Sequence, residues 1–374
     1  MDKKGISEIK KTFTKEKCII DHITGRFVDE DGSTIAEINT PFHSLQEEEA
    51  DQYCKILKKI LSGKQGKSLY DINFSTQEET SGEKHPRLMR MISSVQDDAA
   101  EQKAMDDIVA NLDRAGQHLI LIAHGMYDIP MKATDGRMTD EASEFVYSFI
   151  VTAICPVERV KNGLCFEAGS REFKDHSMDL SVKAPVLGFM FPAFNNRQMD
   201  IHQAIYYAKK EDERHPELVD MLFGTELPTP ESQQKDAFAT VITQTLGRDC
   251  TFDNVMAVTN TVNELVKEHT DDIEPMEIGK TEIKQMLKAS DVPSETIDHL
   301  DAVYDEQAPS ENFAAENIGG KSTVDLKSDS MKLSVSADMT SMIKSKTIDG
   351  TEYLLIPIQD SLELNGIPIL LSRK

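Results

Sequence analysis

The chain has 374 residues and a formal net charge of −24 at pH 7, with 39% hydrophobic and 28% charged residues. This composition excludes a wholly disordered chain, and the length exceeds what one hydrophobic core usually covers, so we expect two or three structural units. The cysteines are widely spaced without a CxxC pair, which excludes a disulfide scaffold and a cysteine zinc site, and no apolar run is long enough to span a membrane.

The negative charge lies in the middle of the chain. Residues 1–64 hold 11 Lys and Arg against 12 Asp and Glu, residues 319–374 hold 7 of each, and residues 65–318 hold the remaining 23 against 46. A surface this acidic repels phosphate backbones. We therefore expect any nucleic-acid contact to be indirect or confined to a local basic patch. The one dense basic stretch supplies these candidate contacts, although a solvated helix face explains the same pattern: Lys3, Lys4, Lys10, Lys11, Lys15 and Lys17.

The opening third alternates helical and strand patterns. No apolar stretch follows the first lysines, so we expect no signal peptide and a cytoplasmic location. In chain order we predict a short helix, a strand pair over 17–28 and 33–38, a helix over 45–63, a strand over 69–74, a polar loop over 77–85 and a helix over 86–114.

Residues 117–207 change character to short apolar runs bounded by Gly or Pro. The runs are HLILIAHGMYDIP, FVYSFIVTAICPV, GLCFEA and VLGFMFPAF. Because little helix lies between them, they predict the strands of one buried sheet that is antiparallel or mixed.

From Glu211 the pattern is helical, and strands return near the end of the chain. This predicts an α+β fold in which a central sheet with flanking helices precedes a helical middle region and a small C-terminal β unit. The predicted parts are an α+β domain, an acidic helical region, a linker and the β unit, over residues 1–210, 211–307, 308–320 and 321–374.

Short motifs that suggest nucleotide or DNA binding have simpler explanations. GGKST at Gly319–Thr323 and GKT at Gly279–Thr281 lack the earlier glycine of a P-loop, so we interpret them as a linker and a helix N-cap. The helix pair over 281–306 has the proportions of a helix-turn-helix, but its second helix carries five carboxylates and no Lys or Arg. Phosphates would be repelled, so a packing or protein-docking pair is the better interpretation.

The pattern of metal ligands and nucleophiles assigns no catalytic residue, metal or cofactor. The histidines are dispersed, and His118 and His124 flank an apolar run as strand-end residues. Cys155 precedes a proline at the end of an apolar run, which is typical of a buried structural thiol.

One polar cluster follows the apolar run GFMFPAF. Polar groups just past a buried strand often form a ligand site, so its residues are binding candidates. A turn whose Asn side chains satisfy backbone groups, followed by an N-cap at Asp200, explains the cluster better. The candidates are Asn195, Asn196, Arg197, Asp200 and His202.

Four strings resemble an uncharacterised bacterial protein family that is defined only as a domain of unknown function. They are KKGISEIKK at the start, AICPV at 153–157, GFMFPAFNNRQMDIHQAIYY at 188–207, and the closing IDGTEYLLIPIQDSLELNGI. The resemblance covers nearly the whole chain and implies no activity.

The C-terminal half also resembles the bacterial nucleoid-associated protein family, in the order and spacing of its segments. The matching segments are DMLFG at 220–224, the helices that follow, KLSVSADM at 332–339 and LNGIP at 364–368. This resemblance implies association with the bacterial chromosome or its enzymes, through protein contacts, and carries over no functional residue.

Three functions therefore compete. The first is a non-enzymatic, nucleoid-associated or DNA-transaction-linked binding protein that acts mainly through protein contacts. The second is an acidic protein-interaction or regulatory scaffold unrelated to DNA, and the third is an enzyme that uses the sheet region, which would require His124, Arg197 and His202 to share a pocket. We expect a protein partner and no membrane, and homodimerisation is left open.

Overall fold

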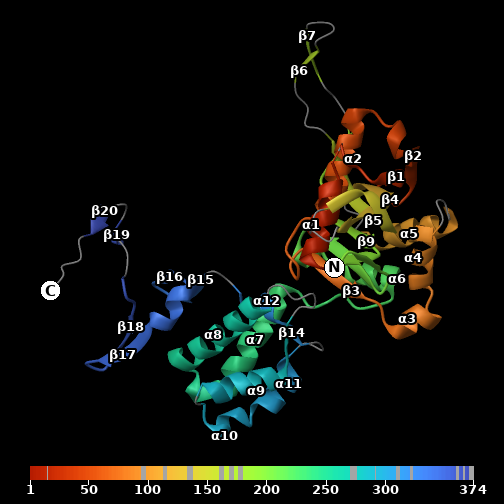
Figure 1. Ribbon diagram of the computed structural model, residues 1–374. Coiled ribbons are helices and arrows are strands. Elements are labelled where there is room, and N and C mark those ends of the chain that lie inside the picture. Colours follow the sequence, from red (N-terminus) through yellow and green to blue (C-terminus); the bar gives the residue numbers. More distant parts are fainter. Residues whose placement is uncertain are drawn as a thin grey trace. The chain divides into compact units, whose positions relative to one another are not determined.

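The computed structural model divides the chain into two compact units, Met1–Pro230 and Glu231–Lys374 (Figure 1). It describes residues 1–14, 16–93, 98–112, 116–132, 138–159, 164–167, 172–175, 180–269, 276–290, 292–308, 312–320, 323–358, 362–364 and 367–369. A large sheet with helices, followed by a helical region and small sheets, confirms the α+β class. Within the described ranges, no helix is both long and apolar enough to cross a membrane.

The first unit is built on an eight-stranded sheet in the order β2-β1-β4-β5-β9-β12-β3, with β8 beside β5. All these pairings are antiparallel, which confirms the predicted buried sheet and decides between its two alternatives. The strands are β1 (Ile20–Val28), β2 (Thr34–Pro41), β3 (Leu69–Asn73), β4 (Gln117–Lys132), β5 (Met138–Arg159), β8 (Leu180–Val182), β9 (Leu187–Phe191) and β12 (Gln203–Ala208).

The prediction that GLCFEA joins this sheet is wrong. The run forms β6 (Leu164–Glu167), which pairs with β7 (Glu172–Asp175) in a separate two-stranded sheet. The two short segments are neighbours in sequence, so each satisfies the other's backbone groups locally without a place in the larger sheet.

Helices cover both faces of the large sheet (Figure 1). On one face, α1 (Lys3–Thr12) and α2 (Glu47–Ile60) pack with Leu121 of β4; on the other, α4 (Lys84–Ser93), α5 (Asp98–Asn111) and α6 (Pro216–Phe223) pack with Ile122. Successive strand residues point to opposite faces, so the continuous apolar run in β4 supplies two cores at once. The first unit thus extends through α6 to Pro230, beyond residue 210, where we predicted the first domain to end.

Helix α2 forms where its sequence pattern predicts. Gln46 and Glu49 make a capping box at its start, and Lys58 and Lys59 occupy its last turn, as the helix dipole favours. The helix approaches β9 closely at Gly188. A Cβ added there would lie 2.3 Å from the Thr152 carbonyl oxygen and 2.5 Å from Cδ1 of Ile60, so the position requires glycine.

The polar segment 77–85 is mostly helical, so the prediction of a loop is wrong. Helix α3 (Thr76–Ser81) begins after Ser75, whose hydroxyl accepts the Glu78 N–H at 3.1 Å, and ends at Gly82. None of its residues is buried, so it lacks the apolar periodicity from which helices are recognised. Local capping stabilises it instead.

The second unit contains a helical core. Its helices are α7 (Glu231–Leu246), α8 (Phe252–Glu268), α9 (Lys280–Ala289), α10 (Ser294–Ile297), α11 (Leu300–Gln307) and α12 (Ala315–Ile318). Gly279 is the N-cap of α9, as predicted, and its N–H donates to Glu282 at 2.9 Å. Two carboxylates of α11, in the acidic second part of the helix pair predicted over 281–306, bond to lysines of α9: Asp305 to Lys280 at 2.5 Å and Asp301 to Lys284 at 3.2 Å.

The segment predicted to be a linker, 308–320, includes ordered elements of this core. Strand β14 (Phe313–Ala314) pairs with β13 (Glu277–Ile278), and α12 follows directly. Phe313 is fully buried, and its ring meets those of Phe238 and Tyr304 edge-on. One buried aromatic side chain therefore fixes a segment whose composition resembles a linker.

The C-terminal residues form the expected small β structure as three separate hairpins. They are β15 (Thr323–Lys327) with β16 (Lys332–Ser336), β17 (Lys344–Ile348) with β18 (Thr351–Leu355), and β19 (Leu362–Leu364) with β20 (Ile367–Ile369). The predicted turn at Asp349-Gly350 is present, with φ values of 51° and 79°. Every residue of β17 and β18 is exposed.

Candidate functional site

The polar cluster predicted from sequence lies on a tight hairpin of the first unit. Strands β10 (Ala193–Asn195) and β11 (Gln198–Asp200) pair antiparallel around Asn196 and Arg197. These two residues have φ values of 47° and 58°, the left-handed conformation that a two-residue hairpin turn requires.

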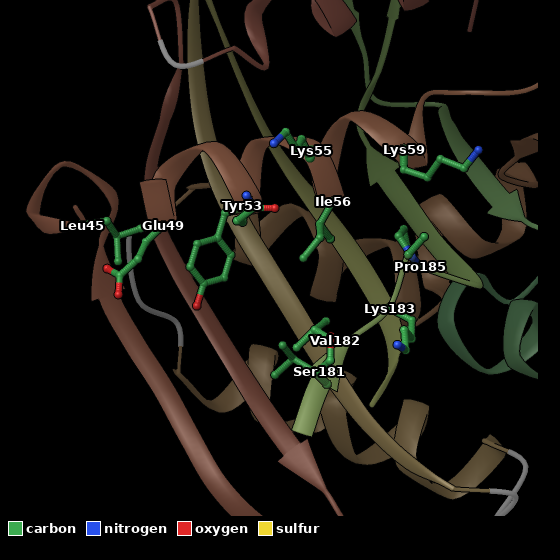
Figure 2. A pocket seen from close by; sticks show the side chains of 13 residues that line it. Leu45, Glu49, Tyr53, Lys55, Ile56, Lys59, Ser181, Val182, Lys183 and Pro185 are labelled. Carbon is green, nitrogen blue, oxygen red and sulfur yellow. The ribbon is translucent and has the colours of Figure 1, made fainter. Parts of the chain in front are cut away.

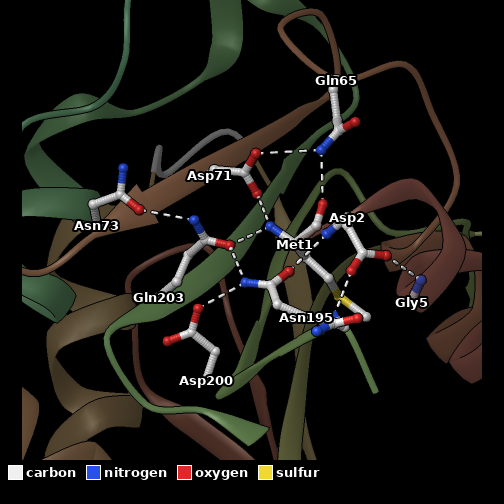
Figure 3. Close-up of polar contacts among 10 residues, drawn as sticks. Met1, Asp2, Gly5, Gln65, Asp71, Asn73, Asn195, Asp200 and Gln203 are labelled. Carbon is white, nitrogen blue, oxygen red and sulfur yellow. Dashed lines mark hydrogen bonds and ion pairs between the residues drawn. The ribbon is translucent and has the colours of Figure 1, made fainter. Parts of the chain in front are cut away.

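Asn195 and Asn196 hold the start of α1. The Asn195 side chain accepts the Asp2 N–H at 2.7 Å and donates to Asp200 at 2.7 Å, and the Asn196 N–H donates to the Asp2 carboxylate at 2.6 Å (Figure 3). Asp2 is also the N-cap of α1. The hairpin therefore anchors the helix through backbone groups, as the turn interpretation of this cluster proposed. Asp200 caps no helix; its carboxylate accepts the His202 N–H at 3.0 Å.

Met1 lies at the centre of the same network. Its side chain and α-amino group are buried, and the amino group contacts the side chains of Asp71 and Gln203. Gln65 donates to the Met1 carbonyl oxygen at 2.8 Å (Figure 3). Strands β3 and β12 are thus joined to α1 by polar side chains that bond to one another.

The other two candidates take different partners. Arg197 contacts Glu8 at 2.9 Å and donates to the Pro130 carbonyl oxygen at 2.6 Å, whereas the exposed His202 contacts Glu79 at 2.7 Å. The hydrogen bond to Glu79 raises the pKa of His202. The side chains of Arg197 and His202 therefore contact different partners from those of Asn195 and Asp200, although the His202 N–H bonds to Asp200. The role of the five candidates in ligand binding stays a prediction.

His124, which the enzyme hypothesis requires beside Arg197 and His202, has a separate environment. It lies within β4, not at the end of a strand, and its Nε2 is 2.8 Å from the buried Glu101 of α5, although its N–H is not directed at that carboxylate. Glu101 also accepts the Thr24 hydroxyl at 2.7 Å. Burial raises the pKa of Glu101, but the contacts with His124 and Thr24 outweigh it, and the net shift is downward. This cluster joins α5 to the sheet, so the three side chains do not form a common site.

A groove of about 650 Å³ runs along α2 on the opposite face of the sheet. Helix α2 forms one side, and the segment from Ser181 to Pro185 forms the other, with Leu119 of β4 between them. Figure 2 shows Tyr53 and Ile56 pointing from the helix toward Ser181 and Val182. Its size and apolar lining are those of binding grooves for small ligands or peptide segments.

Charged side chains lie at both ends of the α2 wall. Glu49 lies in the first turn of α2, and Lys59 lies in the last turn, about 15 Å away along the helix. Burial raises the pKa of the Tyr53 hydroxyl, and the nearby Glu49 raises it further. Lys183 lines the opposite side, 3.8 Å from Glu158. The groove therefore has a mixed lining: Tyr53, Ile56 and Val182 are apolar, Lys55 lies midway along the α2 wall and is paired with Asp51, and Glu49 and Lys59 give the two ends of that wall opposite charge.

Lys59 also lies near two lysines that do not line the groove, Lys58 of α2 and Lys10 of α1. Burial lowers the pKa of Lys10 in α1, and the neighbouring Lys58 and Lys59 lower it further. In the part of the chain that the structure describes, none of these three lysines forms an ion pair with a carboxylate. A cluster of mutually repelling cations favours an anionic ligand, because the ligand relieves the repulsion.

Among the lysines predicted to contact nucleic acid, Lys10 is the one that belongs to this cluster. Lys15 lies outside the described residues. The charges that lower the pKa of Lys10 are those of Lys58 and Lys59, and not those of Lys3, Lys4, Lys11 or Lys17. Sequence analysis missed Lys58, Lys59 and the groove itself, since α1 and α2 meet only in the folded chain. Among the described residues, no group of three or more His, Cys, Asp and Glu side chains could hold a metal ion.

Comparison with known proteins identifies a family but no activity. A family model described as a domain of unknown function, DUF4317, matches residues 1–367. The chain belongs to this family, which confirms the resemblance of nearly the whole chain to a domain of unknown function. No curated protein and no solved structure matches it.

Proposed function

We propose that the protein is a non-enzymatic binding protein that acts mainly through protein contacts, and that the groove beside α2 receives an acidic, partly apolar segment of its partner. The supporting observation is that Lys59, at one end of the groove, lies close enough to Lys58 and Lys10 for their charges to repel one another. In a chain of net charge −24, three clustered lysines without carboxylate partners favour an anionic ligand.

We also propose a direction for the segment, from the charges at the two ends of the α2 wall. Acidic side chains of the partner belong near Lys59, and its apolar side chains belong against Tyr53, Ile56 and Val182. Glu49 repels acidic groups at the far end, so a uniformly acidic ligand fits less well than one with its carboxylates at one end. A helical segment of about ten residues spans the distance.

A labelled peptide tests the proposal. The probe is a synthetic peptide of about ten residues, with leucine and isoleucine in the middle and glutamates at one end; a second peptide carries glutamine instead of glutamate. We expect the glutamate peptide to bind more tightly in fluorescence anisotropy, and added salt to weaken it. Lys59→Glu should lower its affinity about tenfold.

Lys67→Glu is the matched control, because it makes the same charge change at an exposed residue that does not line the groove. Ile56→Asp should weaken both peptides, since it places a charge on the apolar wall. Equal losses for Lys59→Glu and Lys67→Glu would show that net charge alone governs binding, and the groove would be rejected as the site.

The resemblance of the C-terminal half to nucleoid-associated proteins supports a more specific proposal, that the partner is a protein of the chromosome. Pull-down with the whole chain should then enrich chromosomal proteins after nuclease treatment. If partners of other kinds are recovered instead, the alternative of a regulatory scaffold unrelated to DNA is favoured. If random duplex DNA binds at low salt, and Lys10→Glu but not Lys67→Glu abolishes the shift, direct DNA binding replaces the protein-contact proposal.

A further inference from the structure

Two cysteines that are far apart in sequence meet in the first unit. Cys18 lies ahead of β1, and Cys54 lies on α2, 36 residues later. Their sulfur atoms are 3.3 Å apart, and the Cys54 thiol donates a hydrogen bond to the Cys18 sulfur. Both are free thiols.

The two thiols differ in accessibility and acidity. Cys18 is partly exposed, whereas Cys54 is 1% exposed. The hydrogen bond from Cys54 lowers the pKa of Cys18, against the effect of burial, and a backbone hydrogen bond at Ile20 lowers it further. The same hydrogen bond raises the pKa of Cys54, and burial raises it further. Cys18 is therefore the better nucleophile, and Cys54 is the protonated neighbour.

Cys155 and Cys250, the other cysteines whose side chains the structure describes, lack this arrangement. Cys155 is fully buried, and burial raises its pKa to about 12. Cys250 is exposed in the second unit, so it reports how an accessible thiol of this chain reacts. These two residues supply internal controls for burial and for exposure.

We infer that Cys18 and Cys54 form a redox-active dithiol, a site of reversible oxidation by hydrogen peroxide. The Cys18 thiolate attacks the peroxide O–O bond, giving a sulfenic acid at Cys18 and releasing hydroxide, or water after protonation. The Cys54 sulfur then attacks the sulfenic sulfur, and the S–O bond breaks as the S–S bond forms. The thiol proton leaves with the hydroxyl group as a second water. In sum, two thiols are oxidised by two electrons, and one peroxide is reduced to two waters.

The geometry suits the second step. A disulfide bond is about 2.0 Å long, so the sulfur atoms must approach by little more than 1 Å. Cys54 lies between Tyr53 and Lys55, which both line the groove, so the disulfide would join one wall of the groove to the start of β1. The oxidation itself does not depend on whether the groove binds a ligand.

The experiment uses the full chain carrying Cys250→Ser, reduced, desalted and treated with hydrogen peroxide. After remaining thiols are blocked, tryptic digestion without reductant separates residues 18–26 from 27–55, because Arg26 precedes a cleavage point. We expect these peptides to be linked, with a mass about 2 Da below the sum of the reduced peptides. Dithiothreitol should release them.

Two substitutions at residue 54 separate the chemistry from a merely structural role. With Cys54→Ala, dimedone should trap a sulfenic acid at Cys18, and alkylation of Cys18 should require a higher pH than in the parent chain. Cys54→Ser retains a hydroxyl donor, so it should keep the alkylation midpoint low while preventing the disulfide. The inference is overturned if the two peptides stay unlinked in a chain whose circular dichroism is unchanged. It is also overturned if, in the chain that retains Cys250, alkylation of Cys18 and of Cys250 has the same pH midpoint.

Discussion

The central sheet and the C-terminal hairpins both come from sequence predicted to form strands, but their strands are buried to very different extents. All five residues of β9 are buried, whereas all five of β18 are exposed, although β18 contains Tyr353, Leu354 and Leu355. The difference lies in their neighbours: β9 has a strand on each side and helices over both faces, and β18 has β17 alone. An isolated two-stranded hairpin is only marginally stable in water. The strand pattern in the sequence therefore predicts that a segment pairs as a strand. Whether that strand is buried depends on the neighbouring strands and helices that cover it.

The sharpest test of this contrast removes one aromatic side chain from each region. Phe189 of β9 is 1% exposed, and its ring lies 5.1 Å from that of Phe223, whereas Tyr353 of β18 is 47% exposed. Phe189→Ala should lower the free energy of unfolding of the first unit by about 3–5 kcal/mol, through lost burial and a residual cavity.

Tyr353→Ala should change the free energy of unfolding of the second unit by no more than about 0.5 kcal/mol. Urea titrations followed by circular dichroism compare the two variants with the parent chain. A loss of more than about 2 kcal/mol for Tyr353→Ala would mean that the hairpin is covered in solution, and the contrast would then fail.

Replacing one glycine in each region tests the same contrast at the backbone. Gly188→Ala in β9 should cost about 3 kcal/mol, because the new methyl group meets the Thr152 carbonyl oxygen and the side chain of Ile60. Gly350→Ala in the β17–β18 turn meets nothing within 4 Å, so only its φ of 79° opposes it, at about 1–2 kcal/mol. Thermal unfolding of both variants checks the order, and an equal shift in Tm for the two would contradict it.

Two buried carboxylates of the first unit, Glu101 and Asp107, should make its stability depend on pH, and the exposed hairpins have no such dependence to share. The pKa of Glu101 is lowered overall, since contacts with His124 and Thr24 outweigh burial, and that of Asp107 is lowered in the same way by Lys103 and Arg87. A carboxyl with a depressed folded-state pKa stabilises the fold above its unfolded value of about 4 and loses that contribution as pH falls through the folded pKa. The first unit should therefore lose stability below about pH 4.

Glu101→Gln should destabilise the first unit at neutral pH by about 1–3 kcal/mol and flatten its acid response. Denaturation at a series of pH values measures both effects. Asp338→Asn, an exposed substitution in the second unit, is the control and should leave the acid response of the first unit unchanged. An unaltered pH profile in Glu101→Gln would contradict the role given to this contact.

Local patterns predicted many of the elements. The capped amphipathic helix α2, the strand pair β1–β2, the strands β4, β5 and β9, and the turn at Asp349 each carry their signal within a few residues. The predicted loop over 77–85 was wrong because local capping stabilises α3 in spite of its polar composition. The predicted place of β6 in the large sheet was wrong because β6 pairs with its sequence neighbour β7.

The candidate sites came from a different level of structure. The sequence by itself determined α2 and its charges, because helical periodicity and capping act over a few residues. Tertiary packing alone decided that Lys10 meets Lys58 and Lys59, that Cys54 meets Cys18, and that α2 borders a groove. Each of these contacts joins elements that are separate in the chain. Their proximity follows from how α1, α2, the segment before β1 and residues 181–185 pack on one face of the sheet, which no local pattern encodes.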